Sequence, residues 1–325
     1  MLFRSEYLKI PHKKLLHRNF ALIPFLEINP RWKYPKKNIN LHQHAKMLQG
    51  KIKHAPFKIR GTKMVGIINV PLLSHHKSQD KELFSFEEKI VHSVKDGSEI
   101  IDIGAESTRP KAFIKTHEEY WKIIQPYIKN LNYILKRHNF PISLSISIDT
   151  YHFQVIKKIL ESNCDIHFVN DVYGVESREM CLLLRGREIK YVFMHQLGKA
   201  GKYYLNSHEN TINSISEYAL NTMNSLLKYG ISKNKLVFDP GIGFGKSGFQ
   251  VKEILSKIDI LYRNINIPIM VSLSRKKSIL PEDWKPHQLQ QEDIISTLHT
   301  LKLIEKKIDY VRVHNTNMHK LAYLV

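Results

Sequence analysis

Cysteine and long apolar runs are both scarce in this sequence. Only two cysteines occur among 325 residues, Cys164 and Cys181, and they form neither a CxxC pair nor a metal-type spacing. This excludes a disulfide scaffold and a cysteine-ligated zinc site. No apolar run reaches the roughly 20 residues that a membrane-spanning helix needs, and the N-terminus lacks the apolar core of a signal peptide. We therefore expect a cytoplasmic protein that does not bind a membrane.

Acidic residues are few relative to basic ones. Lys and Arg number 50 against 30 for Asp and Glu, so the formal net charge is +20. A charge of this sign fits nucleic acid, a membrane surface or a small anionic substrate. The basic residues are spread along the chain and are not interleaved with aromatic residues that could stack on bases, which argues against nucleic acid. We expect a small anionic substrate that contacts a minority of these residues.

From Thr62 onward, strand-like runs alternate with stretches of helical spacing, such as 208–229. The predicted strands are 63–69, 99–103, 143–148, 166–169, 189–194, 235–238, 268–273 and 309–313. Eight alternating units in this length predict an α/β fold, a (β/α)8 TIM barrel. An open doubly wound sheet is the alternative, but it seldom has eight evenly spaced units.

Polar side chains follow the ends of these predicted strands, where a TIM barrel carries its active site. One group suits the amide-like edges of a flat heterocycle: Asp149, Asn170, Asp239 and Lys276. A second group suits an anion, because forked guanidinium groups bind phosphate oxygens in pairs. Its members are Asn69, Arg275, Arg312 and His314. The sequence therefore predicts a pocket with a heterocycle end and a phosphate end.

Another interpretation assigns some of these side chains to structural roles. Asp149 precedes Thr150 and could cap the next helix, and Asn170-Asp171 could do the same. The glycine-rich segment 241–246 is one residue short of Walker A spacing, so a nucleoside-triphosphate site is not expected there. We interpret its glycines as positions where the backbone approaches a ligand plane closely.

Seven motifs, taken together, resemble dihydropteroate synthase in order and spacing over residues 62–325. They are Ile101–Pro110, Ser147–Tyr151, Asn170–Val172, Met194-His195, Asp239–Lys246, Ser274–Lys276 and Arg312–His314. The resemblance implies a TIM barrel that condenses 6-hydroxymethyl-7,8-dihydropterin pyrophosphate with p-aminobenzoate, with Mg2+ assistance. The products would be 7,8-dihydropteroate and pyrophosphate. A homodimer is a further expectation.

The resemblance also implies a role for each matched position. The pterin would be held by Asp149, Asn170, Asp239 and Lys276. The pyrophosphate would be bound by Asn69, Arg312 and His314, with Asn69 also beside Mg2+. The p-aminobenzoate side would be shaped by Thr108, Arg109 and Pro110. The catalytic group would be Asp149, Lys276, Arg312 and His314.

Residues 1–60 show no alternation of strands and helices and contain several prolines. Their segments Leu8–His12, Arg18–Phe20 and Pro24–Pro30 resemble the C-terminal part of the pterin pyrophosphokinase that precedes the synthase in bifunctional folate-synthesis proteins. The chain begins just where that family's paired metal-binding aspartates should have ended, and phosphoryl transfer needs those carboxylates to hold Mg2+. We expect residues 1–60 to be a kinase-domain remnant and linker, without pyrophosphokinase activity, and residues 61–325 to be the barrel.

The synthase part departs from the family pattern after the first predicted strand. The family continues Asn-Val-Thr-Pro-Asp-Ser-Phe-Ser-Asp-Gly-Gly, whereas here Asn69-Val70 is followed by the unrelated segment 71–80. Smaller changes are Ser272 for a glycine and Asn315 for an aspartate. The altered loop leaves open a pterin-binding homologue without turnover. A pterin-dependent methyltransferase on the same barrel is a third hypothesis, although a methyl donor has no pyrophosphate to bind.

Overall fold

The structure is a computed structural model, and it describes two compact units of the chain. The described residues are 61–73, 79–105, 115–173, 177–196, 210–280 and 289–324, together with isolated positions between 3 and 41. One unit comprises residues 1–60 and 135–144, and the other comprises residues 61–134 and 145–325. Among the described residues, no helix is long and apolar enough to cross a membrane.

The smaller unit contains short elements and an apolar cluster. Strands β1 (Phe3–Arg4) and β2 (Lys9–Ile10) pair antiparallel, and η1 (Leu15–His17) is a 3-10 helix. Four leucines are buried together: Leu16, Leu22, Leu26 and Leu41. Trp32 packs edge-on against the rings of Phe25 and Tyr34, so this unit has an apolar core of its own.

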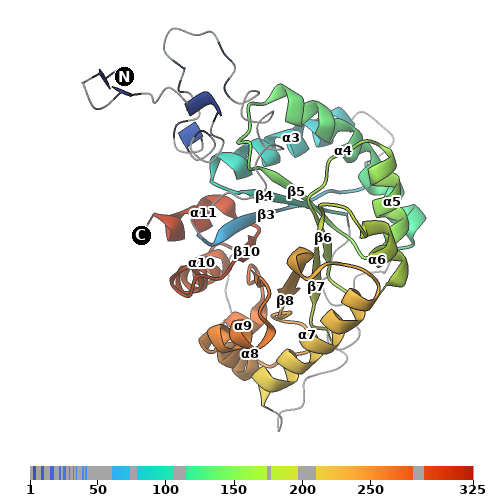
Figure 1. The fold of residues 1–325 in the computed structure, drawn as a ribbon, viewed down its shortest axis with the longest axis vertical. Coiled ribbons are helices and arrows are strands. Elements are labelled where there is room, and N and C mark those ends of the chain that lie inside the picture. The colour runs from blue at the N-terminus through green and yellow to red at the C-terminus, as the bar shows by residue number, and fades with distance from the viewer. Residues whose placement is uncertain are drawn as a thin grey trace. The chain divides into compact units, whose positions relative to one another are not determined.

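The larger unit is a barrel of eight parallel strands, as predicted (Figure 1). The strands are β3 (Lys63–Asn69), β4 (Ile100–Gly104), β5 (Ser145–Asp149), β6 (Phe168–Asp171), β7 (Lys190–Met194), β8 (Leu236–Asp239), β9 (Met270–Ser272) and β10 (Tyr310–Val313). Their order is β8-β7-β6-β5-β4-β3-β10-β9, and one parallel bridge from Phe238 to Ile269 joins the two ends. The predicted TIM barrel is therefore confirmed.

Helices follow the strands and lie around the sheet (Figure 1). They are α3 (Gln79–Lys95), α4 (His117–Arg137), α5 (Phe153–Glu161), α6 (Arg178–Leu184), α7 (Thr211–Lys228), α8 (Gly248–Ser256), α9 (Ile258–Ile265), α10 (Leu289–Glu305) and α11 (Thr316–Lys320). Short 3-10 helices are η3 (Lys233–Lys235), η4 (Lys277–Ile279) and η5 (Leu321–Tyr323). In α7 the buried positions include Ile212, Ile215 and Ala219, which are the apolar positions of the predicted helical segment.

The barrel interior begins with an apolar layer to which seven strands contribute. It consists of Val65, Ile100, Phe168, Val192, Val237, Met270 and Tyr310. Side chains alternate between the two faces of a strand, so the residue two positions later also points inward. Two positions after Ile100, Phe168, Val237 and Tyr310 come Asp102, Asn170, Asp239 and Arg312. The apolar floor therefore supports a polar layer directly above it.

Candidate active site

Arg312 is the centre of this polar layer. Its Nε donates to Asp102 Oδ2 at 2.6 Å, and its Nη2 donates to Asp149 Oδ2 at 2.5 Å. Both carboxylates are buried, and the Arg312 side chain is 11% exposed. Burial alone would lower the pKa of Arg312, but the charges of Asp102 and Asp149 outweigh it and raise that pKa. The guanidinium thus stays charged and holds three strands together.

Neighbouring groups fix the orientation of the same carboxylates. Asn170 Nδ2 donates to Asp102 Oδ2 at 3.2 Å, which also fixes the direction of the Asn170 amide. Tyr120 of α4 is fully buried and donates to the carbonyl of Asp149, while it accepts from the backbone N–H of Ala105. The ends of β4 and β5 are therefore tied to one helix. Asp102 Oδ1 is buried and has no hydrogen-bond partner among the described residues.

Asp239 lies on the opposite side of the barrel mouth, at the end of β8. Its Oδ1 accepts from the N–H of Gly241 at 2.7 Å, and its Oδ2 accepts from Ser272 Oγ at 2.8 Å. Burial raises the pKa of Asp239, although these two hydrogen bonds and the nearby cations act in the opposite direction. The serine that replaces the family glycine thus has a defined role here, because its hydroxyl holds one oxygen of Asp239.

A small pocket opens between these groups. It is lined by Val172, Met194, Asp239, Ile242, Phe244, Ser272, Lys276 and Arg312. Lys276 Nζ lies 4.1 Å from the centroid of the Phe244 ring, in a cation–π contact. Burial lowers the pKa of Lys276 to about 8, while the charge of Asp239 opposes that shift. Apolar walls with a carboxylate, an ammonium and a guanidinium suit a flat heterocycle that carries amide-like hydrogen-bonding groups.

The anion-binding candidates line a second cleft of about 410 Å3. Asn69, Arg275 and His314 lie along it, and so do Lys89 and His92 of α3. Arg312 lines the first pocket and not this one. The structure therefore brings Asn69 and His314 together, whereas Arg312 lies with the proposed pterin residues. Arg275, the other guanidinium of the predicted anion group, lines the second cleft.

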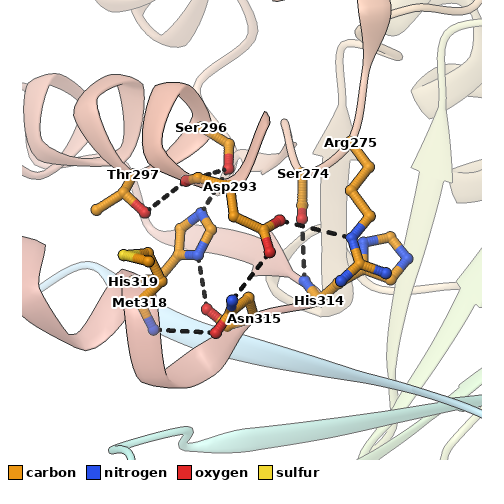
Figure 2. A network of polar contacts seen from close by, with 9 residues as sticks. All are labelled: Ser274, Arg275, Asp293, Ser296, Thr297, His314, Asn315, Met318 and His319. Atoms are coloured by element: carbon orange, nitrogen blue, oxygen red, sulfur yellow. Dashed lines mark hydrogen bonds and ion pairs between the residues drawn. The ribbon is translucent and has the colours of Figure 1, made fainter. Parts of the chain in front are cut away.

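A buried carboxylate on α10 is hydrogen-bonded to two residues that line this cleft (Figure 2). Asp293 is 2% exposed, and its two oxygens accept from Arg275 Nε at 3.5 Å and from Asn315 Nδ2 at 2.9 Å. The His314 backbone N–H donates to Ser274 Oγ at 3.2 Å. Arg275 has a left-handed φ of 61°, a conformation that a non-glycine residue adopts only when its surroundings hold it. Asp293 therefore links the chain after β9 to the chain after β10.

An Asn315→Asp variant is expected to unfold more easily, because it sets a second carboxylate against Asp293. The Asn315 amide now donates to Asp293, and two carboxylates at that distance cannot both ionise without cost. We expect a loss of about 1–2 kcal/mol at pH 7.5. The loss should shrink as the pH falls and one carboxylate takes up a proton. Urea unfolding at pH 7.5 and pH 5 measures both. The matched control is Asn317→Asp, on the exposed first turn of α11; equal stability of both variants would contradict this reading.

The helix-cap interpretation does not hold for the residues that the structure describes. The N-cap of α5 is His152, and the N-cap of α6 is Ser177, whose side chain accepts from Met180 N. Asp149 and Asn170 instead contact Arg312 and Asp102 within the barrel. Thr108, Arg109 and Pro110, predicted for the p-aminobenzoate side, lie outside the described residues.

Two site residues were missed from the sequence, Asp102 and Lys246. Asp102 lies inside a strand, whereas sequence reasoning considered strand ends. The sequence feature that could have identified Asp102 is a single carboxylate between two isoleucines in a predicted strand. Asp102, Ile101 and Ile103 are all buried in the structure. A charge in a buried apolar strand needs a partner. Lys246 Nζ lies 2.8 Å from His195 Nδ1, and both residues are buried beneath the pocket.

Comparisons with known proteins identify the family of this chain. The sequence pattern of the family described as pterin binding enzyme matches residues 65–314. The folic acid synthesis protein of Schizosaccharomyces pombe is 28% identical over 273 residues, which cover 80% of this chain but 36% of the yeast protein. The chain thus spans about a third of that relative. The folate synthesis bifunctional protein of Chlamydia caviae is 26% identical, over 96% of this chain and 70% of its own length.

A solved structure of a dihydropteroate synthase is similar to this chain in sequence and in fold. The dihydropteroate synthase of Clostridium difficile, crystallised in the presence of pteroic acid, is 27% identical and superposes with a TM-score of 0.69. The superposition covers 81% of this chain and 94% of that enzyme. The resemblance to dihydropteroate synthase expected from the motifs is confirmed. By its barrel, by the polar layer at the barrel mouth and by the family pattern over residues 65–314, this chain belongs to the pterin binding enzymes.

Proposed function

We propose that the chain is a dihydropteroate synthase, which joins 6-hydroxymethyl-7,8-dihydropterin pyrophosphate to p-aminobenzoate. The observation that carries the proposal is the pocket where Asp239, Lys276 and Arg312 meet between apolar walls. Asp149 and Asn170 contribute from the layer around Arg312. These groups offer carboxylate, amide and ammonium partners to the pyrimidinone edge of a pterin.

The charges of the pocket suit the reaction. The bond from the pterin methylene carbon to the pyrophosphate oxygen breaks, so positive charge develops on the ring system. Asp102, Asp149 and Asp239 are three carboxylates against the two cations Arg312 and Lys276, so the group carries one net negative charge. These fixed groups stabilise the cation without reorganising. The p-aminobenzoate nitrogen then bonds to the methylene carbon and loses a proton, and no covalent enzyme intermediate is needed.

The leaving pyrophosphate belongs in the second cleft. Asn69 and His314 line it, together with the guanidinium of Arg275. Nε and Nη2 of Arg312 each donate to a carboxylate, and the remaining N–H groups of this five-donor guanidinium keep Arg312 in the proposed pyrophosphate set. Cationic and amide donors at this position bind the phosphate oxygens as negative charge accumulates on them. Thr108, Arg109 and Pro110 keep their proposed place on the p-aminobenzoate side.

Mg2+ fits this donor set as an ion that arrives with the pyrophosphate. Among the described residues, no three His, Cys, Asp or Glu side chains are grouped as a metal site of the protein alone would require. Mg2+ commonly takes one or two protein ligands and completes its shell with substrate phosphates and water. We propose that the Asn69 amide oxygen is such a ligand. When bound, Mg2+ would neutralise charge on the leaving group.

The proposal extends to domains, assembly and location. Residues 1–60 would belong to a pyrophosphokinase-like domain and linker, which the alignment with the Chlamydia caviae protein over 96% of the chain supports. A homodimer is supported by exposed apolar side chains on α10 and η5, namely Ile294, Leu298 and Leu321. Sedimentation at the mass of one chain would contradict the dimer. A cytoplasmic location completes the proposal.

A pterin-binding homologue without turnover is the second candidate. It is favoured by the changed loop after β3, of which residues 74–78 lie outside the described part of the chain. Closure of such a loop excludes water from many active sites, so its loss would affect chemistry more than pterin binding.

A condensation assay separates the two candidates. The full chain is incubated with pterin pyrophosphate, p-aminobenzoate and Mg2+, and dihydropteroate and pyrophosphate are quantified together. We expect equal amounts of both products, and neither when p-aminobenzoate is omitted. Pterin binding without product would favour the homologue without turnover, and absence of both would contradict either candidate.

A further inference from the structure

A buried lysine lies beneath the wall of the proposed pterin pocket. Lys246 is 4% exposed, at the end of the glycine-rich turn that follows β8. Its Nζ lies 3.0 Å from the carbonyl oxygens of both Gly241 and Phe244. It also lies 2.8 Å from Nδ1 and 3.4 Å from the carbonyl oxygen of His195, which follows β7. One ammonium therefore has four acceptors, two from the turn and two from the neighbouring strand end.

The direction of the hydrogen bond to His195 follows from the environment of the ring. Burial and the Lys246 charge together lower the pKa of His195 to about 3, so the ring is neutral. Nδ1 is then the acceptor, and Nε2 carries the ring proton. Tyr218 of α7 lies edge-on to this ring at 4.6 Å between centroids, which keeps the ring in place.

The turn needs a donor at this point because of its backbone conformation. Gly241, Gly243 and Gly245 all have positive φ values, 67°, 79° and 63°. A Cβ added at Gly241 would lie 2.1 Å from the carbonyl oxygen of His195, so the turn lies directly against the end of β7. Buried carbonyl groups without donors are costly. Lys246 supplies the donor to the Phe244 carbonyl, and it is a second donor to the Gly241 carbonyl, which also accepts from the Phe244 backbone N–H at 3.0 Å.

The same turn forms one wall of the pocket. Ile242 and Phe244 line it, and the Phe244 ring faces Lys276 Nζ at 4.1 Å. A Cβ at Gly243 would lie 3.1 Å from Lys276 Cδ, so the turn also limits where the Lys276 side chain can lie. A displaced turn would therefore move both an apolar wall and the ammonium that we assign to the pterin.

We infer that Lys246 is a positioning residue for the pterin: its ammonium holds the 241–246 turn against β7, which places Ile242 and Phe244 against the ligand. The inference rests on the proposed function and adds a residue that does not itself line the pocket. It differs from a general stabilising role in one respect. Its loss should weaken pterin binding while leaving the p-aminobenzoate side unchanged.

The charge state of Lys246 supports this role. Burial lowers the pKa of Lys246 to about 7, with Asp239 opposing the shift and Lys276 adding to it. The other titratable groups that face it are His195 and, across that ring, Tyr218. Above this pH the amine has lost its charge and has two N–H donors for the four acceptors, whereas the ammonium has three donors. Pterin affinity should therefore begin to fall near pH 7.

The test compares Lys246→Met and Lys246→Gln with the wild-type chain. Methionine keeps the apolar stem and removes all donors, and glutamine keeps two. We expect Lys246→Met to raise KM and Kd for pterin pyrophosphate by about 10–100-fold. Glutamine should restore part of that loss, and KM for p-aminobenzoate should stay within about two-fold in both. The fall in pterin affinity near pH 7 should disappear in Lys246→Met. Ionisation of the substrate affects the pH profiles of wild type and variant equally, so the difference between the two profiles reports on Lys246.

Lys252→Met is the matched control, since Lys252 is exposed on α8 and should leave both constants unchanged. If neither Lys246 variant folds, His195→Phe is the alternative variant. It removes the Nδ1 acceptor of Lys246 and keeps an aromatic ring beside Tyr218. It should raise KM for pterin pyrophosphate and leave KM for p-aminobenzoate unchanged. Equal effects on both substrates, or an unchanged pterin constant, would overturn the inference. A wild-type chain that makes no dihydropteroate would instead overturn the proposed function. The role of Lys246 could still be tested in that case, because the Kd for pterin pyrophosphate does not depend on turnover.

Discussion

Arg312→Met is expected to lower the free energy of unfolding by about 3–5 kcal/mol and to abolish measurable dihydropteroate formation. The substitution removes the guanidinium that bonds to Asp102 and Asp149, which are 1% and 7% exposed. Two buried carboxylates would then lose the guanidinium that binds both of them. Such an uncompensated charge costs far more than the intact pair contributes.

Lysine at position 312 should not rescue this variant. Arg312 binds its two carboxylates through separate nitrogens, Nε and Nη2, in a fixed planar geometry. A single ammonium cannot reproduce that fork. Arg312→Lys should therefore recover part of the stability and little of the activity.

Urea unfolding and the condensation assay measure these effects. Arg263→Met is the matched control, because Arg263 forms an exposed ion pair with Asp259 on α9. Exposed pairs of this kind contribute about 0–1 kcal/mol. A stable Arg312→Met protein with normal turnover would contradict the role of Arg312 at the centre of the site.

Lys276→Met is expected to lower kcat/KM for pterin pyrophosphate by about 10²–10³-fold with little effect on folding. Lys276 lines the pocket opposite Arg312 and packs on Phe244. Burial lowers its pKa to about 8; Asp239 and Asp149 oppose that shift, and Arg312 adds to it. The ammonium is therefore charged below pH 8 and neutral above it. Wild-type kcat/KM should fall as the pH rises through 8, and Lys276→Met should lack that transition.

The pH profile distinguishes Lys276 from Lys246. Lys276→Met should keep the fall that we assign to Lys246, moved to a higher pH because the Lys276 charge helps to lower the pKa of Lys246. Lys233→Met is the control, because Lys233 is exposed before β8, at the end of the strand away from the site. If Lys276→Met retained the transition near pH 8, another group would be responsible for it.

The fold was predictable because each strand has a local signature. All eight predicted strands are present, and every predicted bound lies within two residues of the observed one. The predicted strand 268–273 shortens to Met270–Ser272 because Ile269 pairs with Phe238 only as an isolated bridge. An apolar run and the polar residues that end it are adjacent in the sequence, so a strand can be recognised from the sequence alone.

The pairing within the site was not predictable, because it joins distant residues. Arg312 and Asp102 lie 210 positions apart, and a guanidinium near a phosphate motif suggested an anion partner. In the structure the anions that Arg312 binds are two buried carboxylates, and Arg275, the other guanidinium of the predicted anion group, lines the second cleft. Lys246 was read as part of a glycine-rich loop near a ligand. Its contact with His195 depends on the order of β7 and β8 around the barrel.

Calorimetric titration with pterin pyrophosphate tests the central claim most directly, namely that the polar layer around Asp239 and Arg312 is a pterin site. The wild-type chain should bind at one site, and Asp239→Asn should bind at least about 10-fold more weakly. Asp259→Asn, which alters an exposed carboxylate on α9, should bind like the wild type. Absence of binding by the wild type, or equal affinity of Asp239→Asn, would contradict the claim.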